Sequence, residues 1–274
     1  MPKTFLGTQN FENPEIKIIG IPLDITSSFL NGTRFGPQNI RIASENLETY
    51  SVVLKKDLKD KKISDLGDIE ICSDIKKALK MIENKIDREL KSDAKLILIG
   101  GEHTLSLASI KSFLKKFPKL SLIWFDAHLD LRDSYQNNKL SHATVLRRIS
   151  EISDIKIFHI GFRSAIKEEL EFAKKRITLL KASKKEIVKI KRSLKYEPVY
   201  VSFDVDFINP DSVRSVGCPE PGGVYFNEAM ELMYSLKGLN IVGADFVEYN
   251  GLIDPYFTDG TKIAKLIREF LLFM

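Results

Sequence analysis

The sequence lacks most features of secreted, membrane and zinc-finger proteins. Its 274 residues include only two cysteines, Cys72 and Cys218, which lie far apart and form neither a CxxC pair nor a disulfide framework. There is no run of about 18 apolar residues, and the N-terminal residues show no basic segment followed by an apolar one. We therefore expect a cytoplasmic protein that does not associate with a membrane.

The sequence also lacks a strong charge of one sign. Lys and Arg number 42 against 37 Asp and Glu, a formal net charge of +5. The lysines are spread along predicted helices, as in KASKKEIVKIKRSLK (181–195), and are not interleaved with aromatic residues. Solvated helix surface explains this distribution. Nucleic acid is therefore not predicted as a partner.

Short apolar runs alternate with amphipathic segments along the chain, which is the pattern of repeated βα units. Strands are expected at 15–22, 95–101, 120–126, 155–163, 177–180, 198–206 and 240–249. Residues 74–90 repeat apolar side chains every three to four positions, as on one face of a helix. With 43% hydrophobic residues and no linker or repeat, residues 1–274 are predicted to form one α/β domain.

Histidines and aspartates follow the carboxyl ends of three predicted strands. They are His103, Asp126, His128, Asp130, Asp204 and Asp206. Residues two positions apart in an extended segment point to the same side, and open parallel sheets bind ligands at the carboxyl ends of their strands. Gly100 and Gly101, which precede His103, permit a tight turn that brings its imidazole inward.

Two imidazoles and four carboxylates in one pocket repel and desolvate one another unless positive charge lies between them. Six ligands are too many for one ion, but they suit two divalent ions that share bridging carboxylates, roughly 3.5 to 4 Å apart. The carboxylate of Glu248 adds negative charge if its strand joins the same sheet. The pocket is then expected to attract a cation. The alternative for residues 126–130 is a solvated loop with an incidental DxHxD pattern.

Seven segments together resemble the motifs of the ureohydrolase family, which includes arginases and agmatinases. In chain order they are GGEHT, FDAHLD, SHATVLRR, IGFRS, SFDVDFINP, CPEPGG and DFVEYN, and the likeness extends to GIPLDITSSFLNGTRFGP near the N-terminus. The resemblance therefore covers essentially the whole chain. It implies a three-layer α/β/α fold with a central, mainly parallel eight-stranded sheet, and assembly as a homo-oligomer, a trimer or a hexamer.

The same resemblance implies two Mn²⁺ ions per subunit. The residues expected to hold one ion are His103, Asp126, Asp130 and Asp204. Those expected to hold the other are Asp126, His128, Asp204 and Asp206, so that Asp126 and Asp204 bridge the pair. A shell rich in carboxylates also favours Mn²⁺ over Zn²⁺ on general grounds, while nickel and cobalt stay open.

The resemblance further implies that a hydroxide bridging the two ions attacks the carbon of a small cationic guanidino substrate. Glu248 would bind the guanidinium, Asp130 would orient the hydroxide, and His142 in SHATVLRR would transfer a proton to the departing amine. Considered without the resemblance, His142 is equally consistent with a cap of the helix that follows. His159 is predicted to be a core residue and Arg163 a structural hydrogen-bond donor.

The short segment 131–148 resembles the agmatinase form of the family, which implies that agmatine is cleaved to putrescine and urea, a step of polyamine biosynthesis. N1-aminopropylagmatine and guanidinobutyrate are the alternatives, and arginine is less favoured. Cys218 stands where relatives commonly have threonine, so the substrate tail stays open, and its thiol either packs the loop or is sensitive to oxidation. A deacetylase-like enzyme is disfavoured because adjacent histidines are lacking. An inactive regulatory homologue is disfavoured because every ligand position is kept.

Overall fold

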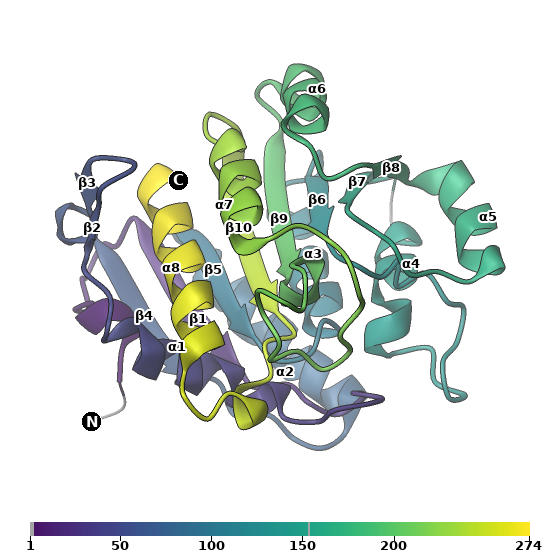
Figure 1. The fold of residues 1–274 in the computed structure, drawn as a ribbon, viewed down its shortest axis with the longest axis horizontal. Coiled ribbons are helices and arrows are strands. Elements are labelled where there is room, and N and C mark those ends of the chain that lie inside the picture. The colour runs from purple at the N-terminus through teal and green to yellow at the C-terminus, as the bar shows by residue number, and fades with distance from the viewer. Residues whose placement is uncertain (1–2, 153) are drawn as a thin grey trace.

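The computed structural model describes residues 3–152 and 154–274, which form a parallel sheet between two layers of helices (Figure 1). The strands are β1 Ile16–Ile21, β4 Ile63–Asp68, β5 Lys95–Gly100, β6 Ser121–Phe125, β7 Lys156–Ile160, β8 Thr178–Leu180, β9 Pro198–Asp204 and β10 Asn240–Val247. Their order is β4-β1-β5-β10-β9-β6-β7-β8, and every neighbouring pair is parallel. The predicted eight-stranded α/β fold is confirmed. A small antiparallel hairpin, β2 Tyr50–Ser51 and β3 Lys56–Asp57, lies outside this sheet.

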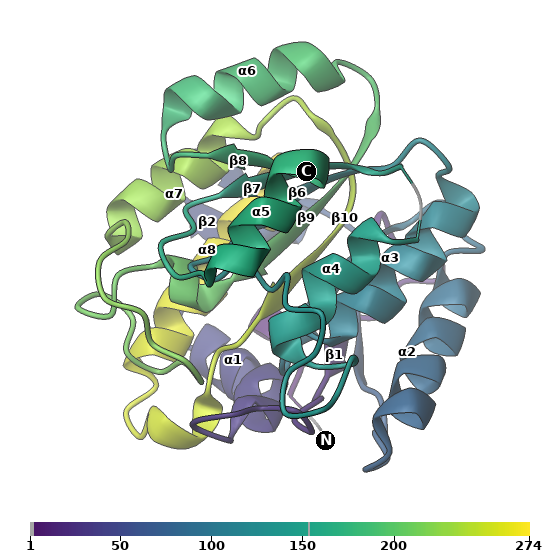
Figure 2. The same ribbon diagram turned by 90° about the vertical axis from the view of Figure 1, so that its right-hand side faces the viewer.

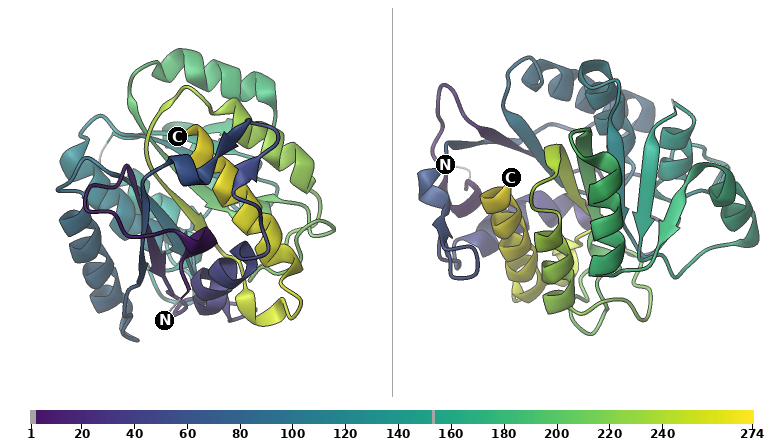
Figure 3. Two further views of the ribbon diagram at one scale, coloured as in Figure 1. Left: turned by 90° about the vertical axis from the view of Figure 1, so that its left-hand side faces the viewer. Right: turned by 90° about the horizontal axis from the view of Figure 1, so that it is seen from above.

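Two helical layers cover the sheet, as the view from above shows (Figure 3, right). One layer comprises α1 Gly36–Ser44, α6 Lys184–Leu194, α7 Phe226–Ser235 and α8 Thr258–Phe273. The other comprises α2 Ile75–Glu89, α3 Leu105–Lys116, α4 Val145–Ser150 and α5 Lys167–Arg176, of which α2, α3 and α4 lie side by side (Figure 2). The single-turn helices are η1 Phe5–Gly7, η2 Thr33–Phe35, η3 Leu58–Asp60, η4 His142–Thr144, η5 Val205–Phe207 and η6 Gly251–Ile253. Within the described residues, no helix is long and apolar enough to cross a bilayer.

Local signals in the sequence account for helix α2. The carboxylate of Asp74 accepts a hydrogen bond from the backbone N–H of Lys77 at 2.9 Å and so caps the helix. Ala78, Ile82 and Ile86 recur on one face and are fully buried against the sheet layer. The amphipathic period thus determines which face of α2 is buried.

Strand β4 is the strand that the sequence analysis missed. Its sequence, ISDLGD, has no apolar run, and it lies at the edge of the sheet. Arg41 of α1 holds it in place: Nε and Nη2 donate to the two carboxylate oxygens of Asp65 at 2.7 and 2.8 Å, and Nη1 pairs with Asp68. A buried ion pair between segments, rather than a hydrophobic pattern, therefore fixes this strand.

The strand order creates the crevice in which a site can form. Strands β5 and β6 follow one another among the sheet strands along the chain, but β10 and β9 lie between them in the sheet. The helices that follow the neighbouring strands β9 and β6 are α7 and α4, which lie in opposite layers, and this change of side opens a crevice at the carboxyl ends of the four central strands. All of the predicted ligands follow or end one of these four strands.

Candidate metal centre

The predicted site residues lie together at the carboxyl ends of the four central strands. His103 follows β5, Asp126, His128 and Asp130 follow β6, Asp204 ends β9, Asp206 lies in η5, and Glu248 follows β10. Gly101 is required here for a reason that differs from the predicted one. Its φ is not in the left-handed region, but a Cβ at Gly101 would lie 1.9 Å from the backbone oxygen of Leu23. Close packing of two backbones, rather than a special turn conformation, demands glycine.

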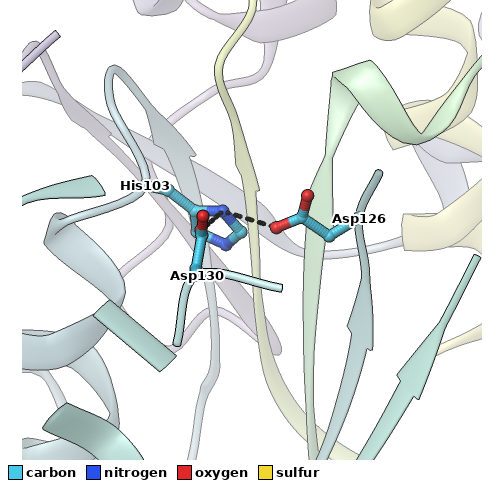
Figure 4. Close-up of side chains that lie close together, drawn as sticks. All are labelled: His103, Asp126 and Asp130. Atoms are coloured by element: carbon cyan, nitrogen blue, oxygen red, sulfur yellow. Dashed lines mark ion pairs between the residues drawn. The ribbon is translucent and has the colours of Figure 1, made fainter. Parts of the chain in front are cut away.

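His103 points its Nδ1 atom toward three carboxylates. Nδ1 lies 3.3 Å from Asp126 Oδ2, 3.5 Å from Asp130 Oδ2 and 3.0 Å from Asp204 Oδ2. Figure 4 shows this nitrogen between the carboxylates of Asp126 and Asp130. Nδ1 is fully buried and forms no hydrogen bond within the described part of the chain. A buried nitrogen without a hydrogen-bond partner costs free energy unless a cation or a proton binds it.

The opposite nitrogen of His103 is held by a buried hydrogen-bond chain. Nε2 lies 2.7 Å from Ser202 Oγ, and Ser202 Oγ donates to Asp245 Oδ1 at 2.6 Å. Because the only proton of the Ser202 hydroxyl goes to Asp245, the hydroxyl must accept from an N–H at Nε2. The lone pair of a neutral His103 therefore lies on Nδ1 and faces the carboxylates. Metal-bound histidines are commonly oriented in this manner by a carboxylate behind them.

Asp126 takes part in two groups of potential ligands. The first is His103, Asp126 and Asp130, and the second is Asp126, His128 and Asp206; within each group one ligand atom per residue lies within 4.8 Å of the others. In the second group, His128 Nδ1 lies 2.8 Å from Asp206 Oδ2 and 3.8 Å from Asp126 Oδ1. Asp126 is therefore shared by both groups, as a bridging residue would be. Asp204 approaches His103 but belongs to neither group, and the bridging roles of both aspartates stay predictions.

The electrostatics of this cluster require positive charge. Burial and the neighbouring charge of Asp126 raise the pKa of Asp130 well above its ordinary value, and burial with the charges of Asp206 and Asp126 raises the pKa of Asp204. Burial alone would lower the pKa of His103, but the carboxylates, Asp126 first, raise it to about 9. Without a metal, protons thus neutralise the cluster. Two divalent cations fit the same donors and would displace those protons.

A cavity of about 290 Å³ opens onto this cluster, and Glu248 and His142 both line it. Glu248 Oε1 accepts a hydrogen bond from the backbone N–H of His103 at 2.6 Å, which leaves Oε2 for a ligand. Burial raises the pKa of Glu248 to about 8, so a cation beside it would favour the ionised form. Glu248 and Asp130 have φ of +65° and +53°, a costly conformation for residues other than glycine that is concentrated at functional sites.

The structure corrects the helix-cap interpretation of His142. Ser141 is the N-cap of η4, where its hydroxyl accepts from the N–H of Ala143, and Thr144 completes a capping box. His142 instead turns its ring into the cavity, with Nε2 3.1 Å from the hydroxyl of Ser28. The cap signal was present in the sequence at Ser141, one residue earlier.

The neighbouring residues behave largely as expected. Arg163 donates to the backbone oxygens of Asp206 and Glu220, both at 2.8 Å, and so ties the loop after η5 to the strand end. His159 is fully buried and lies 2.7 Å from the backbone oxygen of His128, although its Nδ1 has no partner among the described residues. Burial raises the pKa of Cys218 to about 12, which favours packing over thiol reactivity.

Sequence reasoning missed several side chains that orient the candidate ligands through hydrogen bonds. Ser202 and Asp245 orient His103, as described above. Glu169 is buried and accepts the N–H groups of Leu131 and Ile166, both at 2.9 Å, and so fixes the backbone beside Asp130. No spacing rule connects residues so far apart in sequence, so only the fold shows that they meet.

Comparisons with known proteins agree with this geometry. The sequence profile of the arginase family matches residues 14–273. The chain is 37% identical to an agmatinase of Bacillus cereus, covering 98% of this chain and 96% of that protein, and 36% identical to the N(1)-aminopropylagmatine ureohydrolase of Thermococcus kodakarensis, covering 92% and 89%. The structure of the agmatine ureohydrolase of Thermoplasma volcanium superposes with a TM-score of 0.89 at 30% identity, covering 99% of this chain and 94% of that one.

Proposed function

This chain belongs to the arginase family, a family of hydrolases, and on that premise we propose that it hydrolyses agmatine to putrescine and urea. The observation that carries the proposal is the arrangement of the cavity. Asp130, Asp206 and Glu248 line the cavity together. Asp126, which both groups of potential metal ligands share, is buried within the same cluster. A guanidinium bound at Glu248 is thereby placed next to the cluster.

We propose that the cluster binds two divalent cations, Mn²⁺ in preference to Zn²⁺, because four of its six donors are carboxylates. The residues that would hold them are His103, Asp126, His128, Asp130, Asp204 and Asp206. When bound, such a pair of cations lowers the pKa of a coordinated water enough to provide a nucleophile at neutral pH. The orphaned Nδ1 of His103 supports this assignment, since it faces three carboxylates and has no hydrogen bond within the described residues.

The remaining steps depend on residues of this chain. Glu248 holds the planar guanidinium through charge-assisted hydrogen bonds and fixes the position of its carbon. Asp130, buried in a left-handed backbone conformation, accepts a hydrogen bond from the attacking water and orients it. His142 gives a proton to the departing amine, a contribution that is typically worth about 10²- to 10⁴-fold in rate. The products are urea and an amine.

Agmatine suits the cavity because its net charge is positive and the lining includes the carboxylates of Asp130, Glu169, Asp204, Asp206 and Glu248. N1-aminopropylagmatine carries the same guanidinium and a longer cationic tail. One observation favours guanidinobutyrate as a second candidate. Arg132 lines the cavity with its guanidinium over the Tyr135 ring at 5.2 Å, and it forms no ion pair with the described residues. The Arg132 guanidinium is therefore available to bind the carboxylate tail of guanidinobutyrate.

The decisive experiment measures urea release by purified protein loaded with Mn²⁺, with agmatine, arginine, N1-aminopropylagmatine and guanidinobutyrate in parallel. We expect agmatine to be cleaved much faster than arginine. If arginine were cleaved as fast as agmatine or faster, the assignment of agmatine as the substrate would be wrong. If guanidinobutyrate were cleaved faster than agmatine, guanidinobutyrate would be the substrate. If none of the four compounds released urea, the assignment as a ureohydrolase would fail. Assembly as a trimer or hexamer stays a prediction.

A further inference from the structure

The loop between β1 and η2 lies against the cavity and is fixed by two carboxylates. Glu102 is fully buried next to His103, and it accepts the N–H of Ile25 at 2.8 Å and the N–H and hydroxyl of Thr26 at 2.6 and 2.8 Å. Asp24, within the loop, accepts the hydroxyl of Ser27 at 2.7 Å. The loop therefore has a defined position relative to the candidate metal centre.

This loop contacts His142 at two points. The backbone N–H of His142 donates to Thr26 Oγ1 at 3.1 Å, and Thr26 can accept because its own proton goes to Glu102. The imidazole Nε2 lies 3.1 Å from Ser28 Oγ. Thr26 thus holds the backbone of His142, while Ser28 contacts its ring.

Among the described residues, Ser28 is the hydrogen-bond partner of the His142 ring. The other nitrogen, Nδ1, is buried and has no partner among them. Burial lowers the pKa of His142 to about 4, so the ring is neutral at neutral pH and carries one proton. Cys218 Sγ lies 3.9 Å from Ser28 Oγ and competes only weakly for its hydroxyl, since thiols are weak hydrogen-bond partners.

We propose that Ser28 is a positioning residue that fixes the orientation and the tautomer of His142, and through it controls proton delivery to the departing amine. The proposal rests on the proposed function for its catalytic consequence, but the Ser28–His142 contact is independent of it. A neutral imidazole takes up a proton only at its unprotonated nitrogen, and it then releases that proton to the departing amine and becomes neutral again. The partner of Nε2 therefore decides which nitrogen relays the proton.

The kinetic test compares Ser28→Ala, Ser28→Thr and Ser27→Ala. Ser27→Ala is the matched control, because it removes one hydroxyl from the same loop without touching His142. The hydrogen bonds to Glu102, and that of Asp24 with the N–H of Gly32, still hold the loop in this variant. We expect Ser28→Ala to lower kcat about 10-fold or more with little change in KM, since part of the general-acid contribution is lost. Ser28→Thr, which keeps the hydroxyl, should restore most of the activity. An equal loss in Ser27→Ala, or no loss in Ser28→Ala, would overturn the proposal.

A double-mutant cycle separates an effect through His142 from a general disturbance of the site. If Ser28 acts through His142, adding Ser28→Ala to His142→Ala should cause no further loss of kcat. Full additivity of the two losses would contradict the proposal. Mn²⁺ content, measured on each variant, should be unchanged.

A spectroscopic experiment tests the proposal without measuring catalytic turnover. The chain has only four histidines, so ¹⁵N-histidine NMR of the Mg²⁺-loaded protein can follow each ring, and His142→Ala assigns the signal of interest. We expect one dominant His142 tautomer in the wild type and a mixture in Ser28→Ala. Unchanged ring ¹⁵N shifts in Ser28→Ala would refute the proposal even if no guanidine were cleaved. Absence of urea release with a shifted tautomer would instead count against the proposed function alone.

Discussion

The carboxylate of Asp126 accepts hydrogen bonds at both of its oxygens. Oδ2 accepts the indole N–H of Trp124 at 2.9 Å, and Oδ1 accepts the backbone N–H of His128 at 2.6 Å. The indole also stacks on the His103 ring, with centroids 4.0 Å apart. Although burial alone would raise it, the charge and close approach of His103 hold the pKa of Asp126 at about 2. The carboxylate is thus ionised and oriented before any cation binds.

Replacement of Asp126 by Asn should abolish urea release and remove bound metal, because both ligand groups lose their shared carboxylate. Elemental analysis of the purified variant and a urea assay check this. Asp133→Asn is the matched control: it lies in the same segment, its side chain is 53% exposed, and it should keep both metal and activity. An Asp126→Asn variant that retained two ions and normal turnover would refute the bridging role.

The hydroxyl of Ser202 should determine metal affinity, although it lies behind His103. Ser202→Ala removes the acceptor for the Nε2 proton, and changes of this kind typically cost about 10- to 100-fold in metal affinity or activity. Ser106→Ala is a close control, because the Ser106 hydroxyl also donates to Asp245, at 2.8 Å, but forms no hydrogen bond with the His103 ring. Metal titration of both variants checks the prediction. Equal affinities for the two would show that the orientation of His103 does not depend on Ser202.

At the scale of elements, Asp259 joins the first turn of α8 to the loop between η5 and α7. Its carboxylate accepts the backbone N–H groups of Arg214 and Ser215 at 2.8 and 3.0 Å, and Lys262 donates to it at 2.9 Å. Burial opposes ionisation, but these donors outweigh it and hold the pKa of Asp259 below its ordinary value of 3.8. The ionised carboxylate therefore stabilises the fold.

Because the pKa of Asp259 is lower in the folded than in the unfolded state, its stabilisation is complete above pH 3.8 and is lost as the pH falls through the folded pKa. Asp259→Asn should lower the free energy of unfolding by about 1–3 kcal/mol at pH 7, as expected for hydrogen bonds to a charged group. The difference between the free energies of unfolding of the wild type and the variant should shrink as the pH falls below 3.8. Denaturant titrations between pH 2.5 and 7 measure it, with the exposed Asp211→Asn as control. A difference that did not depend on pH would contradict the assignment.

At the scale of the whole molecule, the candidate metal centre joins segments that are distant in sequence. Its proposed ligands come from the ends of β5, β6 and β9, so the unfolded chain cannot present them together. Cation binding should therefore stabilise the folded state selectively. The buried carboxylates strengthen this effect, because without cations they repel one another unless protons bind them.

Chelation followed by dialysis should lower Tm, and Mn²⁺ added at 100 times its Kd should raise Tm by roughly 5–10 °C, corresponding to about 2.7 kcal/mol in a chain of this length. Differential scanning calorimetry at several Mn²⁺ concentrations checks this. The shift should be absent in Asp126→Asn. A Tm that did not respond to Mn²⁺ in the wild type would mean that the cluster does not bind the ion in the folded protein.

Local patterns in the sequence were sufficient for seven of the eight strands and for the strand ends that carry the candidate ligands. Apolar runs predicted the buried strands, and the two-residue spacing of Asp126, His128 and Asp130 placed three polar side chains after one strand. Both signals act over a few residues, so they are readable in a single chain. Strand β4 was missed because its place depends on a contact with Arg41, far away in the sequence.

The sequence by itself determined which chemical groups are present and which strand ends carry them, since these follow from side-chain type and local period. Only the tertiary structure decided which nitrogen of His103 faces the carboxylates and that Ser28 contacts the His142 ring. These outcomes depend on hydrogen bonds between residues 99 and 114 positions apart. Such bonds form only after the sheet has brought the strand ends and the β1–η2 loop together.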